Sequence, residues 1–305
     1  MKIFITGVSG QLGYDIALEG IRREIEVYGT DLGENSLLEG TSYHSMDIRN
    51  LQEIEDLIQE IQPDVVFHAA AWTAVDDAED KENVKAIFEI NEKATGVIAK
   101  ACKKIKAKMI YISTDYVFNG QGDLPWEVDS KDFSPLNKYG ESKLAGEEAV
   151  QHFTDKAFIV RIAWVFGMNG KNFVKTMLRV GEKYDEVRVV SDQIGRPTYT
   201  EDLSKLLFEM AKTDKYGIYH ATNEGDYISW YDFTCEIYRL ADLKTKVTPV
   251  TTEEYGLSKA KRPFNSRLST SKLQEKGFNP LPEWKDALER YINKINNSGG
   301  SHGTN

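Results

Sequence analysis

Three glycines near the start of the chain constrain its fold more than any other feature. Residues 2–6 form a short apolar run typical of a buried strand, and Gly7, Gly10 and Gly13 follow it directly. Residues 14–22 then read as a helix. Glycines at a strand-to-helix turn let the backbone approach a pyrophosphate, whose charge is stabilised at the helix N-terminus. A glycine-rich turn without a ligand is the alternative, but the flanking strand and helix favour a dinucleotide site.

An acidic residue follows at the spacing that such a site requires. The apolar stretch 25–28 runs into Gly29, Thr30 and Asp31. In dinucleotide-binding folds an acid about 20 residues beyond the glycines hydrogen-bonds the adenosine ribose. Its carboxylate would repel a 2′-phosphate, so Asp31 favours NADH over NADPH. An arginine reaching in from elsewhere would still admit the phosphate.

Strand-like and helix-like segments alternate through the first half of the chain. After Asp31 we expect strands near 43–46, 63–70, 108–114 and 158–164, with helical segments at 51–61, 82–104 and after Pro135 between them. This alternation implies right-handed crossovers, and therefore an α/β fold with a Rossmann-type, doubly wound parallel sheet. Ligands of such sheets bind beyond the carboxyl ends of the strands.

The regularity loosens from about Phe166. We therefore expect an NAD(P)-binding Rossmann domain over residues 1–165. A smaller C-terminal α/β part over residues 166–296 is expected to bind mainly substrate, with some of its segments returning to the main sheet. Residues 297–305 are rich in Gly, Ser and Asn, a composition that predicts a disordered tail.

Composition excludes several classes of protein. The chain has 305 residues, 41% hydrophobic and 28% charged, with a net charge of −10, which argues against broad binding to nucleic acid or anionic membranes. The two cysteines, Cys102 and Cys235, predict free thiols rather than a disulfide framework. No long apolar run is available to span a membrane. The first strand starts at Lys2, which leaves no room for a signal peptide, so we expect a cytoplasmic protein.

A Tyr-x-x-x-Lys pattern supplies a candidate for proton transfer. Tyr139 and Lys143 are four residues apart, so on a helix they share one face. A neighbouring ammonium lowers the pKa of a phenol by stabilising phenolate, and a tyrosine tuned in this way can serve as a general acid. By itself the pattern is weak, because fifteen tyrosines and many lysines make a chance match common, and a half-buried tyrosine beside a solvated lysine is the more frequent explanation.

Two further strand ends are expected to meet this pair. Ala69, Ala70 and Ala71 end the strand at 63–70, and their small side chains would let a ribose or nicotinamide lie against the backbone; close packing at a crossover is the alternative. Thr114 ends the next strand and offers a hydroxyl to a carbonyl oxygen. Only the convergence of these features favours a role over an ordinary turn residue.

Taken together, these motifs resemble the extended short-chain dehydrogenase/reductase superfamily and, within it, the dTDP-4-dehydrorhamnose reductase family. The more specific motifs run in the family's order along nearly the whole chain, at Ser113–Phe118, Ser134–Gly140, Ser142–Glu147, Arg161–Phe166, Asn172–Met177, Asp192–Thr198 and Arg262–Leu268. The resemblance implies NADH- or NADPH-dependent reduction of the C4 ketone of dTDP-4-dehydro-β-L-rhamnose to dTDP-L-rhamnose, a precursor of cell-surface polysaccharide.

The resemblance also implies roles at matching positions. Tyr139 is the proton donor, Lys143 binds the nicotinamide ribose and lowers the pKa of the tyrosine, and Thr114 helps to polarise the C4 carbonyl. Positions near the cofactor are Gly7, Gly10, Gln11, Leu12 and Gly13 at the pyrophosphate turn, Asp31 at the ribose, Asp47 and Ile48 near the adenine, and Ala69, Ala70 and Ala71 near the nicotinamide. Thr114, Asp115 and Trp164 would contact the sugar nucleotide, although a tryptophan at a strand end often belongs to the core.

Some roles stay open. Arg196 and Arg267 are candidates for binding the diphosphate, since a planar guanidinium suits bidentate contact, and a structural ion pair is the alternative for each. Some family members form dimers through Mg²⁺ held by acidic side chains. Asp15 lies near one such position, but its partner ligands cannot be matched in this sequence. Metal dependence and a homodimer are both left open.

Two rival functions use the same fold. Dehydratases of the superfamily commonly carry Thr-Asp-Glu at the strand end, where this chain has Thr114, Asp115 and Tyr116. The missing acid counts against dehydration, while an epimerase is excluded less easily. A non-catalytic subunit that binds a dinucleotide, like the β subunit of methionine adenosyltransferase, is the second rival. Every catalytic position here holds a competent residue, which favours an enzyme.

Overall fold

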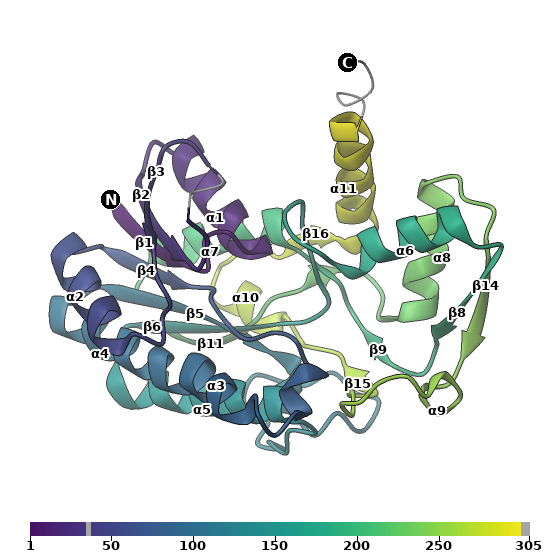
Figure 1. Cartoon of the computed structure of the whole chain (residues 1–305), viewed down its shortest axis with the longest axis horizontal. Helices are drawn as coiled ribbons and strands as arrows, with labels where there is room; N and C mark the ends of the chain where they lie inside the picture. The colour runs from purple at the N-terminus through teal and green to yellow at the C-terminus, as the bar shows by residue number, and fades with distance from the viewer. Residues whose placement is uncertain (35–37, 300–305) are drawn as a thin grey trace.

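A seven-stranded sheet forms the centre of the computed structural model, which describes residues 1–34 and 38–299 (Figure 1). Every neighbouring pair of strands in it is parallel. From one edge to the other the order is β11 (Gly217–His220), β6 (Ala157–Ile162), β5 (Lys108–Thr114), β4 (Val65–His68), β1 (Lys2–Thr6), β2 (Glu26–Asp31) and β3 (Thr41–Ser45). The chain reverses its direction of winding between β1 and β4, where ligands of such sheets bind. The predicted doubly wound sheet is confirmed.

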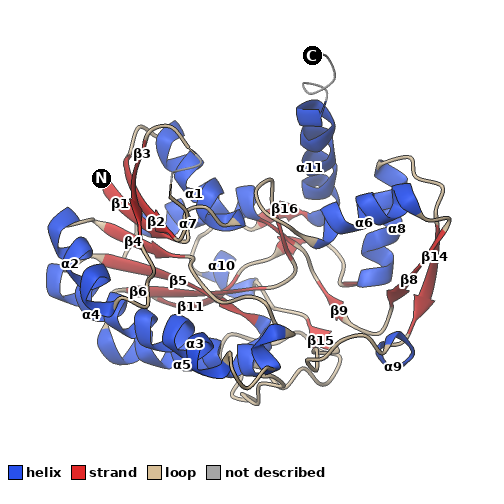
Figure 2. Cartoon of the chain, viewed as in Figure 1, coloured by secondary structure: helices blue, strands red, loops and turns tan. Residues whose placement is uncertain are grey.

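Helices cover both faces of this sheet (Figure 2). One face packs against α1 (Gln11–Arg22) and α7 (Thr200–Ala211). The other packs against α2 (Leu51–Ile61), α4 (Thr95–Ile105) and α5 (Lys138–Phe153). The inner strands are buried from both sides, which explains why they read as nearly continuous apolar runs rather than as an alternating pattern.

Local sequence signals place several of these elements. Asn137 caps α5 by accepting the backbone N–H of Gly140 at 2.9 Å. The predicted segments 51–61 and 108–114 coincide with α2 and β5. The expected helical region over 82–104 is confirmed. It consists of three consecutive segments, because α3 (Val84–Phe88) passes into a π-helix, Glu89–Ala94, before α4 begins.

The C-terminal half adds a second layered unit with its own apolar cluster. Its helices are α6 (Phe173–Lys183), α8 (Trp230–Leu240), α9 (Thr252–Tyr255) and α11 (Trp284–Gly299). Small sheets accompany them: β8 (Glu186–Val190) with β14 (Lys246–Val250), β7 (Val165–Phe166) with β10 (Thr198–Tyr199), β12 (Asn223–Glu224) with β16 (Leu281–Glu283), and β9 (Ile194–Gly195) between β13 (Ile228–Ser229) and β15 (Asn265–Ser266).

Two segments from beyond residue 166 belong to the main sheet. Strand β11 pairs in parallel with β6, and α7 packs beside α1. The short helix α10 (Ser271–Glu275) lies against β11. The hydrophobic core is therefore not divided near residue 165. The proposed boundary there remains a prediction about which residues bind the cofactor and which bind substrate. Of the predicted tail, residues 297–299 continue α11, and the remainder lies outside the described residues.

Both cysteines are free thiols, as predicted. Cys102 is buried in α4, and burial raises the pKa of its thiol to about 12. Cys235 in α8 is partly buried. Across the described part of the chain, every helix is too short or too polar to cross a bilayer.

Candidate active site

A cleft of about 450 Å³ opens at the carboxyl ends of β1, β2, β4 and β5. Its volume suits a small-molecule ligand. Almost all of the predicted cofactor positions line it, namely Gly7, Gly10, Gln11, Leu12, Asp31, Asp47, Ile48, Ala69, Ala70, Ala71, Tyr139 and Lys143. The predicted substrate residues Thr114, Asp115 and Trp164 line the same cleft. The structure therefore brings together strand ends and a helix that are far apart in sequence.

The glycine turn forms a tight bend under one end of the cleft. Gly7 has φ +73°, and a Cβ there would lie 2.7 Å from the backbone of Ala70, so only glycine fits. A Cβ on Gly13 would lie 2.0 Å from the carbonyl oxygen of Gly7, which explains why Gly13 packs behind the turn and does not line the cleft. The N-cap of α1 is Gly10, which has no side chain to occupy the first N–H groups of the helix. This cradle fits a dinucleotide pyrophosphate.

Two acids lie at the same end of the cleft as the glycine turn. Asp31 accepts the N–H of Ser9 at 2.9 Å and the N–H of Leu32 at 2.8 Å, so its carboxylate is fixed beside the glycine turn. Asp47 is paired with Arg49, whose guanidinium lowers the pKa of that carboxyl. Among the described residues that line the cleft, Lys143 is the only lysine or arginine.

A relay of hydroxyl and carboxyl groups lies at the opposite end. The Thr114 side chain lies close enough to the phenol of Tyr139 to lower its pKa, and the Thr114 hydroxyl donates to Oδ1 of Asp115 at 3.0 Å. The Asp115 side chain is 2% exposed, and its Oδ2 has no hydrogen-bond partner among the described residues. A buried, unpaired carboxylate oxygen is costly unless a ligand donates to it. Burial also raises the pKa of Asp115 to about 6.

The pKa of Tyr139 corrects one expectation. The sequence predicts that Lys143 lowers it, whereas burial raises the pKa of Tyr139 above its ordinary value, opposed by the hydrogen bond with Thr114. Lys143 is 2% exposed, and burial lowers its pKa to about 7, opposed by the charge of Glu147. Its ammonium lies 4.1 Å from the ring centre of Tyr111. Desolvation is the largest influence on both groups, and it disfavours the charged form of each.

The π-helix holds the helix that carries this pair. The Asn91 amide accepts the N–H of Trp72 at 2.9 Å and donates to its carbonyl at 3.2 Å. It also donates to the hydroxyl of Ser142 at 2.9 Å, and Ser142 donates to the carbonyl of Tyr139 at 2.8 Å. Asn91 is 1% exposed and thus ties the segment after β4 to the first turn of α5.

A second cavity, of about 420 Å³, adjoins the cleft through Tyr116 and Trp164, which line both. Trp164 has φ +52°, a strained conformation for a bulky residue. Its ring stacks on Trp230 with centroids 3.7 Å apart. Gly195 makes room for it, since a Cβ there would lie 2.8 Å from Cε2 of Trp164. Aromatic walls of this kind suit a planar ring such as a nucleobase.

The two predicted diphosphate ligands lie outside both cavities. Arg196 is 5% exposed and donates within the chain, with Glu224 at 3.0 Å and Thr222 at 3.0 Å among its partners. Arg267 donates to Oδ1 of Asn265 at 3.0 Å. Neither lines the cleft or the second cavity. The geometry therefore favours a structural ion pair for Arg196, with Glu224, and a structural hydrogen bond to an amide for Arg267.

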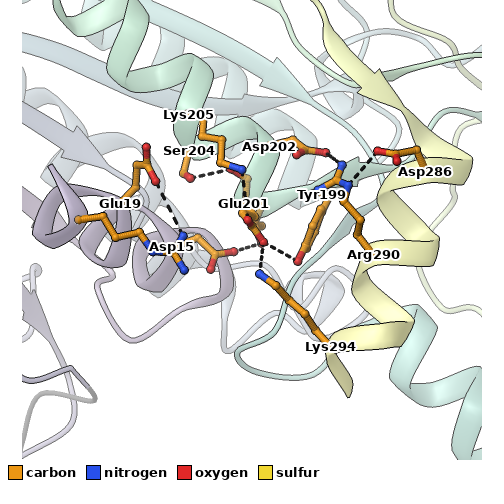
Figure 3. A network of polar contacts seen from close by, with 12 residues as sticks. Asp15, Glu19, Tyr199, Glu201, Asp202, Ser204, Lys205, Asp286, Arg290 and Lys294 are labelled. Atoms are coloured by element: carbon orange, nitrogen blue, oxygen red, sulfur yellow. Dashed lines mark hydrogen bonds and ion pairs between the residues drawn. The ribbon is translucent and has the colours of Figure 1, made fainter. Parts of the chain in front are cut away.

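Within one chain, the residues around Asp15 do not form a metal site. Asp15 accepts from the hydroxyl of Thr200, and burial raises its pKa to about 6. The neighbouring carboxylate of Glu201 is already paired with the ammonium groups of Lys205 and Lys294 (Figure 3). Within residues 1–34 and 38–299, no group of three or more His, Cys, Asp or Glu side chains is arranged to hold a metal.

Sequence reasoning missed several residues that shape the site. Asn91 lies inside a helical stretch, Trp230 follows a strand, and Asp76 and Arg262 pair across 186 residues of chain at 2.7 Å. Nothing in the local sequence marks Asn91, Asp76 or Trp230. Arg262 had a signal, because it begins the motif Arg262–Leu268.

Comparison with known proteins agrees with this geometry. The sequence matches the family described as the RmlD substrate binding domain over residues 1–297. The chain belongs to this family.

Among relatives of the family, the chain is 38% identical over 291 residues to the spore coat polysaccharide biosynthesis protein SpsK of Bacillus subtilis (strain 168), covering 95% of this chain and 96% of that protein. It is 36% identical to the dTDP-4-dehydrorhamnose reductase of Escherichia coli (strain K12), covering 97% and 98%. A solved dTDP-4-dehydrorhamnose reductase of Bacillus anthracis str. Ames, in complex with NADP, superposes with a TM-score of 0.88 at 38% identity, covering 96% and 99%. The predicted resemblance to these reductases is confirmed.

Proposed function

We propose that this chain reduces the C4 ketone of dTDP-4-dehydro-β-L-rhamnose to dTDP-L-rhamnose with a nicotinamide cofactor. The observation that carries the proposal is the convergence of Tyr139, Thr114 and Lys143 with the glycine turn in one cleft. Relatives that share 36% identity over nearly the whole chain bear the name of this activity. The adjoining aromatic cavity supports a nucleotide-linked substrate.

A reduced nicotinamide held in the cleft would supply the hydride for C4 of the sugar. Tyr139 donates its phenolic proton to the C4 oxygen, and Thr114 hydrogen-bonds to the same oxygen. The raised pKa of Tyr139 keeps the phenol protonated before transfer. Lys143 binds the nicotinamide ribose and, once protonated, stabilises the phenolate that forms. The Tyr139 proton is then restored from solvent.

Other residues hold the substrates in place. Gln11 and Leu12, at the N-terminus of α1, line the cleft, and their backbone N–H groups would hold the pyrophosphate. The unpaired oxygen of Asp115 accepts from a sugar hydroxyl, which removes the cost of burying it. Trp164 packs against the nucleotide and, with Tyr116, separates the two cavities.

We further propose that NADH is preferred over NADPH. The fixed carboxylate of Asp31 would face a 2′-phosphate, and no arginine lines the described part of the cleft to offset it. The Bacillus anthracis relative was solved with NADP, so the preference is a property to measure in this chain. We expect kcat/KM to be at least about 10-fold higher for NADH, which corresponds to about 1.4 kcal/mol.

The test of the function is Tyr139→Phe, which removes the proton donor and keeps the ring. Turnover of dTDP-4-dehydro-L-rhamnose should fall by about 10²–10⁴-fold, while the dissociation constant for NADH, followed by nucleotide fluorescence, stays within twofold of the wild type. Unchanged turnover in a folded variant would exclude the mechanism.

The same assay separates the rival functions. Net oxidation of one NADH per sugar is expected of a reductase, whereas an epimerase recycles its cofactor and oxidises none. Comparing kcat/KM for a UDP-linked analogue with that for the dTDP-linked sugar measures the specificity for the nucleobase. Absence of any turnover, together with co-purification of a larger partner, would favour a regulatory subunit.

A further inference from the structure

Residues 259–262, in the C-terminal half, are held by a carboxylate at the edge of the second cavity. Oδ1 of Asp76, in the loop after β4, accepts the backbone N–H of Lys259 at 3.1 Å and of Ala260 at 2.9 Å. Its Oδ2 accepts from Nη2 of Arg262 at 2.7 Å. One side chain therefore binds three donors of a segment that lies 183 to 186 residues away in sequence.

The same segment is attached to the helix that carries Tyr139. Nδ2 of Asn137, the N-cap of α5, donates to the carbonyl of Lys261 at 2.8 Å. Its Oδ1 accepts the N–H of Gly140 at 2.9 Å. One amide thus fixes both the start of α5 and residues 259–262, so a shift of this segment would be transmitted to the first turn of the helix.

Arg262 extends the connection towards Tyr139 itself. Its Nη1 donates to the hydroxyl of Tyr116 at 3.3 Å. The Tyr116 ring packs edge-on against the Tyr139 ring, with centroids 5.5 Å apart and an interplanar angle of 75°. Asp76, Tyr116 and Arg262 also line the second cavity.

We expect this arrangement to fix the geometry of the site rather than to stabilise the fold. The side chains of Arg262 and Asp76 are 29% and 43% exposed, and ion pairs that remain in contact with water contribute little to folding. If the carboxylate is lost, water can satisfy the released donors. What is lost is the fixed position of the cavity wall, and catalysis is sensitive to displacements of about 1 Å.

We propose that Asp76 and Arg262 are positioning residues that hold segment 259–262 against α5, shape the sugar-nucleotide cavity and orient Tyr139 through Tyr116. The inference rests on the proposed function. It predicts that the pair affects the reaction of the sugar nucleotide and leaves binding of the dinucleotide unchanged, because Asp76 and Arg262 do not line the cofactor cleft.

The test compares Asp76→Ala, Arg262→Ala and the double variant with Asp80→Ala. Asp80 is a matched control: it is 42% exposed and pairs with the Lys259 ammonium of the same segment, but it lines neither cavity. Each single variant should lower kcat/KM for dTDP-4-dehydro-L-rhamnose by about 10-fold, and the double variant by no more than about 10-fold, because both residues act through one contact. Asp80→Ala should react as the wild type, and the NADH dissociation constant should stay within twofold in all four.

Three results would overturn the inference: full activity of Asp76→Ala, an equal loss in Asp80→Ala, or a parallel loss of NADH affinity. If an alanine variant does not fold, Asp76→Asn and Arg262→Lys keep the shape of the pair, and the same comparison applies. If the wild type does not reduce the ketone, the proposed function fails. Calorimetry then measures dTDP binding, which tests whether Asp76 and Arg262 shape the second cavity. Weaker dTDP binding in Asp76→Ala than in Asp80→Ala would support the inference, and equal binding would reject it.

Discussion

Tyr139 and Lys143 lie on one face of α5, and burial drives both towards their uncharged forms. For the phenol this is useful, because a reductase must hold the proton before it donates it. For the lysine the lowered pKa means that its charge is lost at an unusually low pH. Cofactor and substrate charges are therefore needed to complete the electrostatics of the pair.

The pH profile of kcat/KM for the cofactor should report the lowered pKa of Lys143. That ratio reflects the free enzyme, in which Lys143 titrates at about pH 7. We expect the ratio to fall as the pH rises through this value, because the ammonium that binds the ribose is lost. Lys143→Arg should move the descending limb to higher pH, since a guanidinium keeps its proton. A profile that stays flat well above neutrality in the wild type would contradict the assignment.

A substitution at Gly195 tests whether the position of the Trp164 ring matters for substrate binding. A Cβ at this position would lie 2.8 Å from Trp164 and 3.0 Å from Cβ of Ser266, so Gly195→Ala must displace the indole ring. We expect KM for the sugar nucleotide to rise on the order of 10-fold, as for other displacements of about 1 Å. NADH affinity should not change. An unaltered KM would show that Trp164 does not contact the substrate.

At the scale of elements, α5 depends on a buried ion pair. Glu147 and Arg161 are 1% and 0% exposed, and their side chains make two hydrogen bonds, at 2.8 and 2.7 Å. Ser113, at the end of β5, also donates to Glu147. The pair therefore joins α5 to β5 and β6, directly behind the site.

Removing one partner should be costly, because the other stays buried without compensation. We expect Glu147→Gln to lower the free energy of unfolding by about 3–5 kcal/mol. The adjacent Glu148 is exposed, and Glu148→Gln should change it by less than about 0.5 kcal/mol. Urea unfolding followed by circular dichroism measures both. Equal stabilities of the two variants would mean that the pair adds nothing to docking of α5.

Element boundaries were predictable where periodicity is strong. Apolar spacing alone located α2 and β5. The π-helix at Glu89–Ala94 was not predictable, because Asn91 bonds to Trp72 and Ser142, and neither is a sequence neighbour. Local propensity contains no information on such contacts.

At the scale of the whole molecule, the main core is shared by both halves of the chain. Leu203, Leu207 and Phe208 of α7 are buried against the β1 side of the sheet, and β11 completes its edge. Burial of an apolar side chain of this size contributes about 1.5–3 kcal/mol to the free energy of unfolding. The three together therefore approach the free energy of unfolding of an entire domain.

A fragment of residues 1–165 should therefore not fold by itself. We expect the fragment to lack a cooperative thermal transition, to bind an apolar dye such as ANS and to show no measurable NADH affinity. The full chain, by contrast, should keep its sheet until it unfolds in one main thermal transition. A stable fragment that binds NADH would establish residues 1–165 as an independent domain.

The sequence by itself determined the parallel sheet and the glycine turn, because these depend on local periodicity and on backbone freedom at Gly7 and Gly13. The family resemblance supplied most of the cofactor positions that line the cleft. Only the tertiary structure decided the charge states of Tyr139 and Lys143, the internal pairing of Arg196, and the contact of Asp76 with Arg262. Burial and long-range pairing set these properties, and both arise only when distant segments pack together.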